Sequence, residues 1–196
     1  FISGGVESVS QYTSFLGAGG IYESDHNPVF AAAKDRSAAM AADNVTWTDP
    51  RLEGLLPDVY LSVGQTAENV ATSRGITRAR QDEWAVTSQN RAEAAIASGF
   101  FAADISPVTC PDGTVVSADD GPRAGVTLEA LAGLKPVFRE TGTVTAGNCC
   151  PLNDGAAAVV VMSDRKAKEL GLTPLARVVA TAATGLSPEI MGLGPV

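Results

Sequence analysis

A loop rich in glycine, asparagine and aspartate leads directly into a long apolar run. The loop covers residues 143–154, and residues 156–162 then read AAAVVVM. An apolar run of this length between turn residues favours a strand buried on both faces. Ser163 is expected to cap a helix over residues 164–170, and residues 175–183 are β-rich again. This order predicts a βαβ unit and therefore an α/β fold.

Helical signals recur along the middle of the chain. An alanine-rich stretch within residues 28–44 has high helix propensity. Thr66 is expected to cap a helix over residues 67–73, and Thr77 to begin a longer helix that ends at Gly99.

The long helix carries a stripe of small and apolar side chains on one face. We expect that stripe to pack against another element and the opposite face to meet solvent. The stripe comprises Trp84, Ser88, Ala92, Ala95 and Ile96, and the opposite face carries Arg78, Gln81, Asp82 and Glu93.

A short hairpin and a short helix follow. Residues 105–109 and 114–117 flank a Cys-Pro-Asp-Gly turn, in which Gly113 supplies the positive φ that closes the hairpin. A short helix is expected within residues 127–134. At the start of the chain, Phe1 to Ser3 are expected to end a strand, with Gly4 and Gly5 as the turn after it.

Composition excludes several classes of protein. The 196 residues are 45% hydrophobic and 18% charged, which is typical of a globular chain. No apolar run approaches the roughly 20 residues that span a bilayer. Fourteen basic against 22 acidic side chains give a net charge of −8, which argues against nucleic-acid binding. A single histidine, His26, rules out a histidine-rich metal site.

Candidate reactive groups are few. The loop of residues 143–154 is either a functional loop or a tight turn whose side chains bond their own backbone. Cys149 and Cys150 have no basic neighbour in the sequence that would activate a thiol, so we expect both to be small packing residues. His26 is expected to be a loop histidine. The alternative is that the protein is an α/β hydrolase that uses His26 in catalysis. Arg123 is expected to be an exposed cation.

Several segments together resemble the thiolase family of acyl-CoA acetyltransferases. They occur in the family's order and span nearly the whole chain, residues 11–60 matching least. They are residues 4–10 (GGVESVS), 64–71 (GQTAENVA), 81–85 (QDEWA), 88–89 (SQ), 134–138 (LKPVF), 142–148 (GTVTAGN), 153–157 (NDGAA), 174–177 (PLAR) and 188–195 (PEIMGLGP).

The resemblance implies a fold class and a domain plan. The fold would be α/β, a thiolase-like layered α/β/α half-domain with an inserted α+β loop domain. Residues 1–13 and 153–196 would belong to the N-terminal thiolase core, and residues 14–152 would form the inserted, coenzyme A-binding loop domain. The family's catalytic cysteines and histidine match no position here, so we expect this chain to be part of a longer protein and inactive alone.

The resemblance also implies which residues face coenzyme A. Ala146, Gly147 and Cys150 match a loop against the pantetheine arm, with Cys150 where serine is common. Val137 and Phe138 match an apolar wall along that arm. Arg123 matches a cation near the adenine end. Ser62 and Val63 match positions near the acyl group, where methionine is frequent at the second.

The implied function is part of an acyl-CoA C-acyltransferase that makes or cleaves 3-ketoacyl-CoA through a cysteine acyl-enzyme. The alternative is a non-catalytic coenzyme A-binding or assembly module of the same superfamily. Coenzyme A and acyl-CoA would be substrates, with no prosthetic group, no metal, and no nucleic-acid or membrane partner. The whole protein is expected to be a cytoplasmic homodimer or homotetramer.

Overall fold

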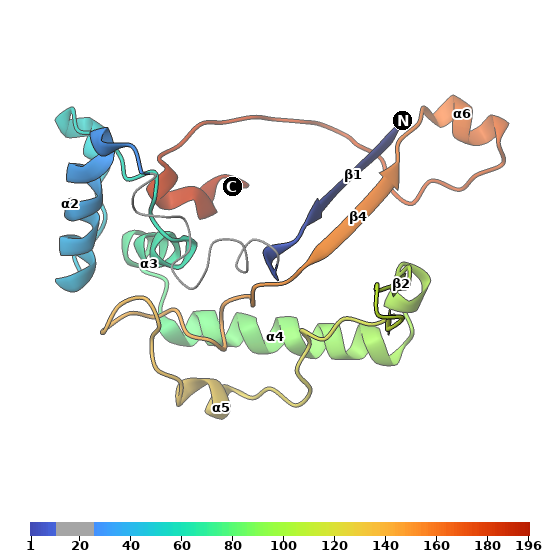
Figure 1. The fold of residues 1–196 in the computed structure, drawn as a ribbon, viewed down its shortest axis with the longest axis horizontal. Helices are drawn as coiled ribbons and strands as arrows, with labels where there is room; N and C mark the ends of the chain where they lie inside the picture. Colours follow the sequence, from blue (N-terminus) through green and yellow to red (C-terminus); the bar gives the residue numbers. More distant parts are fainter. Residues whose placement is uncertain (11–25) are drawn as a thin grey trace. The chain divides into compact units, whose positions relative to one another are not determined.

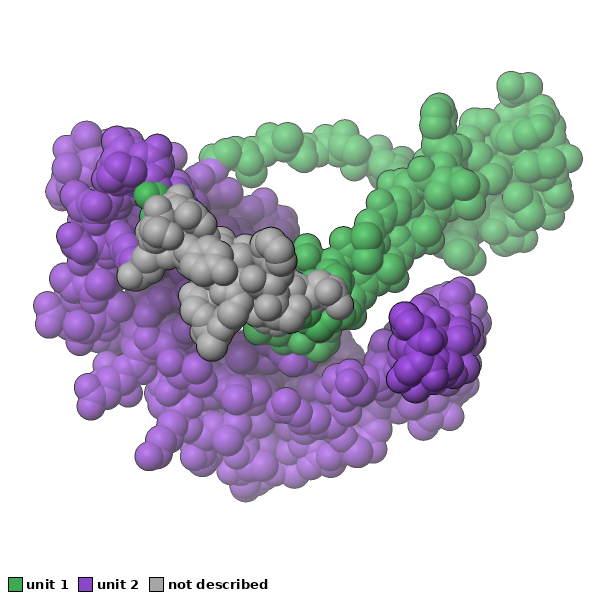
Figure 2. All heavy atoms as spheres, viewed as in Figure 1, with its two compact units in different colours: residues 1–26, 152–185 green, residues 27–151, 186–196 purple. Residues whose placement is uncertain are grey.

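The computed structural model describes residues 1–10 and 26–196, which form two compact units (Figures 1 and 2). Unit 1 comprises Phe1–His26 and Leu152–Gly185, of which residues 11–25 lie outside the description. Unit 2 comprises Asn27–Pro151 and Leu186–Val196. Both units are assembled from stretches far apart in the sequence, and both helices and strands are present. The predicted α/β class is confirmed at the level of a mixed α/β chain.

Unit 1 is built on an antiparallel pair of strands. Strand β1 (Ile2–Glu7) runs beside β4 (Gly155–Val160), with Ile2 opposite Val160 and Glu7 opposite Gly155 (Figure 1). A Cβ at Gly4 would lie 2.9 Å from the carbonyl oxygen of Ala157, so the close approach of the strands needs glycine. Gly4 and Gly5 therefore lie inside a strand, and the expected turn at these residues is wrong.

Helix α6 (Asp164–Glu169) follows β4 as predicted. The Ser163 side chain accepts a hydrogen bond from the Lys166 N–H, and Gly171 has a φ of +67° after the helix. Two expectations fail here. Every residue of β4 is exposed, because the described residues of unit 1 place no second layer against this two-stranded ribbon, and residues 175–183 form no strand. The predicted βαβ unit is therefore absent from the described residues.

Unit 2 is mainly helical. Its elements are the 3-10 helix η3 (Pro28–Phe30), α2 (Ala31–Ala42), η4 (Pro50–Glu53), α3 (Val63–Arg74), α4 (Arg78–Ala97), η5 (Phe101–Ala103), the antiparallel hairpin of β2 (Val108–Thr109) and β3 (Val115–Val116), α5 (Leu128–Ala132) and η6 (Pro188–Leu193). Helix α3 packs against η6, and α4 packs against α5. The alanine-rich helix, the hairpin and the short helix after Thr127 are confirmed.

The caps of α3 and α4 decide where these helices begin. Thr77 caps α4 by accepting a hydrogen bond from the Arg80 N–H, as predicted. Helix α3 begins one turn earlier than expected, because Ser62 and not Thr66 is its cap. Thr66 instead lies inside the helix, and its hydroxyl donates to the Val63 carbonyl at 2.7 Å. Gly75 ends α3 with a φ of +64°, as the sequence indicated.

The buried side chains of unit 2 are largely polar. Apolar members are few, Ala33, Ala71, Leu131 and Val144, whereas the buried polar set includes Asp58, Thr66, Glu68, Asn69, Asp82, Arg139, Thr145, Ser187 and Glu189. Each buried polar group must find partners, since an unsatisfied one costs about 1–3 kcal/mol. Unit 2 is therefore held by specific hydrogen bonds more than by an apolar core.

The two faces of α4 match the prediction only in part. Trp84 is 64% exposed and Ile96 is 49% exposed, whereas Ala92 and Ala95 are half-buried, so the stripe packs within unit 2 only in part. Glu93 on the opposite face is exposed, as predicted. Asp82, expected in solvent, is buried and pairs with Arg78 at 2.7 Å. Polar contacts from α5 and the loop of residues 143–148 decide the buried face of α4, and helical periodicity does not register them.

Candidate functional site

The start of α3 carries two of the predicted site residues. Ser62 is its cap, and Val63 is its first residue and is 67% exposed. A Cβ at Gly64 would clash with the aromatic ring of Phe138, so this ring lies directly on the helix backbone. The structure thus brings the predicted acyl-side residues and the predicted apolar wall together.

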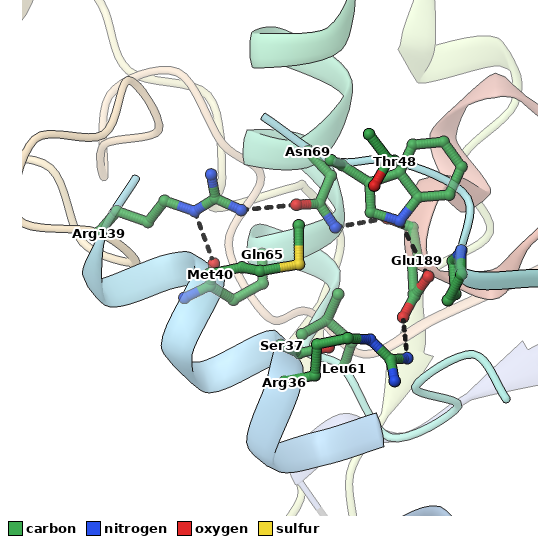
Figure 3. Close-up of a pocket in the computed structure, with 11 residues that line it drawn as sticks. Arg36, Ser37, Met40, Thr48, Leu61, Gln65, Asn69, Arg139 and Glu189 are labelled. Atoms are coloured by element: carbon green, nitrogen blue, oxygen red, sulfur yellow. Dashed lines mark hydrogen bonds and ion pairs between the residues drawn. The ribbon is translucent and has the colours of Figure 1, made fainter. Parts of the chain in front are cut away.

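Gln65 joins the same two segments by hydrogen bonds. Its Nε2 donates to the carbonyl oxygen of Phe138 at 2.6 Å, and its Oε1 accepts from Nε of Arg139 at 3.0 Å. Figure 3 shows Arg139 reaching both Gln65 and Asn69, whose Oδ1 accepts from Nη2 at 2.6 Å. Both amides lie on one face of α3. Two side chains one turn apart on α3 therefore form hydrogen bonds with residues 138 and 139.

Arg139 is buried, with 6% of its surface exposed. Burial lowers the pKa of its guanidinium, and the nearby Glu68 carboxylate opposes this effect. Its Nη1 has no hydrogen-bond partner among the described residues. Arg139 lines a small cavity with Arg36, Ser37, Met40, Trp47, Thr48, Pro50, Leu61, Gln65, Asn69 and Glu189 (Figure 3).

The wall of Val137 and Phe138 is tied to the glycine-rich loop. The Val137 N–H donates to the Val144 carbonyl at 2.9 Å, and Pro136 forms an antiparallel bridge with Thr145. Glu68 fixes the same stretch from α3, because its carboxylate accepts from the backbone N–H groups of Thr143 and Val144, each at 2.8 Å. The loop is thus anchored on both sides just before Ala146.

Asn148 and Gly147 set the shape of the loop. The Asn148 side chain accepts from the Thr145 N–H at 2.8 Å and donates to Oδ1 of Asp82 at 3.0 Å. A Cβ at Gly147 would force the ends of the Leu131 and Leu134 side chains to shift, so the loop lies close against these two leucines. Asn148 thus bonds its local backbone, which is one of the two alternatives for this loop, and its bond to Asp82 ties the loop to α4.

Arg123 meets the loop from a separate segment. Its Nη1 lies 3.4 Å from the carbonyl oxygen of Ala146, and its backbone N–H donates to Oε1 of Gln89 at 2.9 Å. Arg123 is exposed, as predicted, and its guanidinium reaches only this carbonyl among the described residues. Several of its N–H groups are therefore open to an anion.

Cys149 and Cys150 are both free and exposed. The expectation that they are small packing residues is therefore wrong. A turn at Thr145 accounts for the exposure of the two cysteines. The Thr145 carbonyl accepts hydrogen bonds from the N–H groups of Asn148 and Cys149, and after this turn the chain leaves the buried hydrogen bonds of residues 143–145. Cys150 stands at the end of the loop that begins with Ala146.

The remaining observations concern His26, metal binding and membrane spans. His26 is half-buried and belongs to unit 1, whereas the predicted site residues belong to unit 2. Within the described part of the chain, no group of three histidine, cysteine, aspartate or glutamate side chains could hold a metal ion. Among the same residues, no helix is long and apolar enough to cross a membrane.

Three of the residues that hold the site together, Gln65, Glu68 and Arg139, were not predicted from the sequence. Gln65 could have been identified from the sequence, because Ser62 and Gln65 have the spacing of a capping box that starts a helix at residue 63. Glu68 and Arg139 could not have been identified in this way, because nothing local in the sequence indicates a partner about 70 residues away.

Comparison with known proteins identifies the family. The family described as "Thiolase, N-terminal domain" matches residues 1–165. The chain belongs to the thiolase family. The predicted resemblance is therefore confirmed, and the terms thiolase, acyltransferase and acetyl-CoA acetyltransferase apply to its relatives.

Thiolase relatives match large parts of the chain. The acetyl-CoA acetyltransferase of Cupriavidus necator is 55% identical over 145 residues, which cover 71% of this chain and 37% of that protein. The acetyl-CoA acetyltransferase of Escherichia coli is 45% identical over 183 residues, which cover 91% of this chain and 46% of that protein. This thiolase chain thus spans less than half the length of these relatives.

A solved thiolase structure supports the same assignment. The dimeric peroxisomal thiolase of Saccharomyces cerevisiae aligns with a TM-score of 0.74 and 32% identity. The alignment covers 99% of this chain and 44% of the yeast chain. Both the sequence and the backbone therefore match part of a thiolase.

Proposed function

We propose that this chain is part of an acyl-CoA C-acyltransferase and supplies its coenzyme A-binding surface. The proposed contacts are Ser62 and Val63 near the acyl group, and Val137 and Phe138 along pantetheine. Ala146, Gly147 and Cys150 would lie against the same arm, and Arg123 near the adenine end. All eight residues lie within residues 14–152, the segment that we propose as the inserted loop domain.

A continuous path of contacts within unit 2 carries this proposal. Gln65 joins the start of α3 to Phe138, Val137 bonds Val144 in the next segment, and Ala146 at the end of that segment meets Arg123. Segments from four parts of the sequence thus form one connected surface. Such convergence of separate segments is expected of a binding surface. Unrelated surface residues would not be expected to be joined by a chain of hydrogen bonds.

The surface has the chemistry that coenzyme A requires. Val63 and Val137 are 67% and 60% exposed, which leaves apolar side chains free to contact a pantetheine arm. The exposed guanidinium of Arg123 can form charge-assisted hydrogen bonds with a phosphate. A net charge of −8 does not oppose this, because salt limits the field of distant charges to about 8 Å at physiological ionic strength.

The chemistry of the whole protein would be acyl transfer in two steps. A cysteine thiolate takes the acyl group from a thioester, and coenzyme A or a second acyl-CoA then receives it. None of Cys110, Cys149 and Cys150 matches a catalytic position in the resemblance, so this chain would bind and orient the substrate. We propose that the whole protein acts as a homodimer or homotetramer.

Titration calorimetry with coenzyme A tests the binding role directly. The 196-residue chain is expected to bind coenzyme A, and the absence of binding would refute the proposal. The same preparation is expected not to cleave acetoacetyl-CoA. Measurable cleavage by this chain alone would contradict the division of roles.

A further inference from the structure

We propose that Gln65 is a positioning residue that sets the spacing between the start of α3 and the apolar wall of Val137 and Phe138. The inference rests on the proposed coenzyme A-binding surface and adds a residue that does not itself touch the ligand. By fixing this spacing, Gln65 would fix the width of the pantetheine and acyl side of the surface.

The primary amide of Gln65 is held at both ends by consecutive residues. Nε2 donates to the Phe138 carbonyl at 2.6 Å, and Oε1 accepts from Nε of Arg139 at 3.0 Å. One group must be donor and acceptor at the same time, and it must reach from the first turn of α3. Glutamate at this position would keep the acceptor and lose the donor, and leucine would lose both.

The two partners of Gln65 are themselves immobilised. Arg139 is buried and is fixed a second time by Asn69, whose Nδ2 donates to the Glu189 carbonyl at 2.9 Å. The Phe138 ring lies on the backbone at Gly64, where a Cβ would clash. The amide of Gln65 thus connects two rigid elements, and its loss would free residues 137–138 on the side that faces α3.

The adenine side of the surface is held by other groups. Arg123 is placed by Gln89 and meets the Ala146 carbonyl, and neither contact involves Gln65. A change at Gln65 should therefore weaken contacts with pantetheine and leave contacts with the adenine end unchanged. A general loss of folding would weaken both ends together.

Calorimetry with separate parts of coenzyme A tests this split. The probes are coenzyme A, pantetheine and adenosine 3′,5′-bisphosphate, with Gln65→Leu and Gln65→Glu compared with the unmodified chain. Both variants should bind coenzyme A and pantetheine about tenfold more weakly, which is the loss expected for one or two hydrogen bonds. Binding of adenosine 3′,5′-bisphosphate should stay unchanged. Ser73→Ala, which removes a hydroxyl from the far end of α3, is the control and should bind all three probes normally.

Hydrogen exchange gives a second readout that needs no ligand. Exchange of the backbone amides of residues 137–139 should speed up in Gln65→Leu and not in Ser73→Ala. Normal exchange at these amides, or equal losses for all three probes, would overturn the positioning role. An unmodified chain that binds no coenzyme A would instead refute the proposed function, and variants that bind coenzyme A normally would refute only the role of Gln65.

Discussion

The carboxylate of Glu68 on α3 holds Thr143 by three hydrogen bonds, although the two residues are 75 positions apart. The Thr143 N–H donates to Oε1 at 2.8 Å and to Oε2 at 3.0 Å, and its hydroxyl donates to Oε2 at 2.9 Å. Glu68 is 1% exposed. The start of the proposed pantetheine loop therefore depends on a buried carboxylate on a distant helix.

Glu68→Ala should strongly destabilise unit 2. The change leaves the half-buried N–H of Thr143 and the buried N–H of Val144 without partners, and hydrogen bonds to charged groups contribute about 1.5–3 kcal/mol each. We expect the free energy of unfolding to fall by about 3 kcal/mol or more, measured by urea denaturation. Glu140→Ala, at an exposed glutamate, is the matched control and should change it by less than about 0.5 kcal/mol. Equal effects of the two changes would contradict the anchoring role.

Gly64→Ala should destabilise the contact between α3 and Phe138. Alanine is the better helix former by about 1 kcal/mol, but its Cβ would clash with the Phe138 ring. Because the clash outweighs helix propensity, we expect a net loss of about 2 kcal/mol in thermal or urea unfolding.

A control and a rescue accompany this change. Gly133→Ala is a suitable control, since its Cβ would lie 3.8 Å from the nearest atom. Phe138→Leu combined with Gly64→Ala should cost less than the sum of the two single changes, because the shorter side chain relieves the clash. Additive costs would show that the ring does not meet the helix at Gly64.

Arg123→Ala should weaken coenzyme A binding about tenfold, as expected for the loss of a charge-assisted hydrogen bond to phosphate. The dependence of binding on salt concentration should also decrease. Arg123 is exposed, so the free energy of unfolding should change by less than about 0.5 kcal/mol. Arg80→Ala, at another exposed arginine of unit 2, is expected to leave binding unchanged. Equal binding by both variants would remove Arg123 from the site.

The pKa of Asp154 should respond to Ser10. The Ser10 hydroxyl and backbone N–H donate to this carboxylate at 2.5 and 2.8 Å, and these bonds hold its pKa below the ordinary value. The contribution to stability is therefore present above the unfolded-state pKa of about 3.9 and is lost as the pH falls through the lower folded-state pKa.

Carboxyl NMR titration measures this pKa. Ser10→Ala should raise the pKa of Asp154 toward its ordinary value. Ser8→Ala should raise it less, since the Ser8 hydroxyl lies 3.4 Å from the carboxylate. An equal or larger effect of Ser8→Ala would contradict the assigned contacts.

The sequence was informative where structure is decided locally. Thr77 and Ser163 begin their helices as predicted, because a hydroxyl at a helix start satisfies an N–H two or three residues later. It was misleading where distant partners decide. Asp82 is buried because Asn148 and Arg78 bond to it, and β4 is exposed because the described part of unit 1 supplies no covering layer. The positions near Arg123 and Ala146 came from the family resemblance, whereas their contact came from the structure.

Hydrogen exchange with and without coenzyme A tests the central claim most directly. The claim is that four separate segments form one coenzyme A surface on unit 2. Saturating coenzyme A should slow amide exchange in residues 62–65, around residue 123, in residues 137–138 and in residues 146–150 together. Unchanged exchange in all four segments, or protection confined to other parts of the chain, would contradict the account.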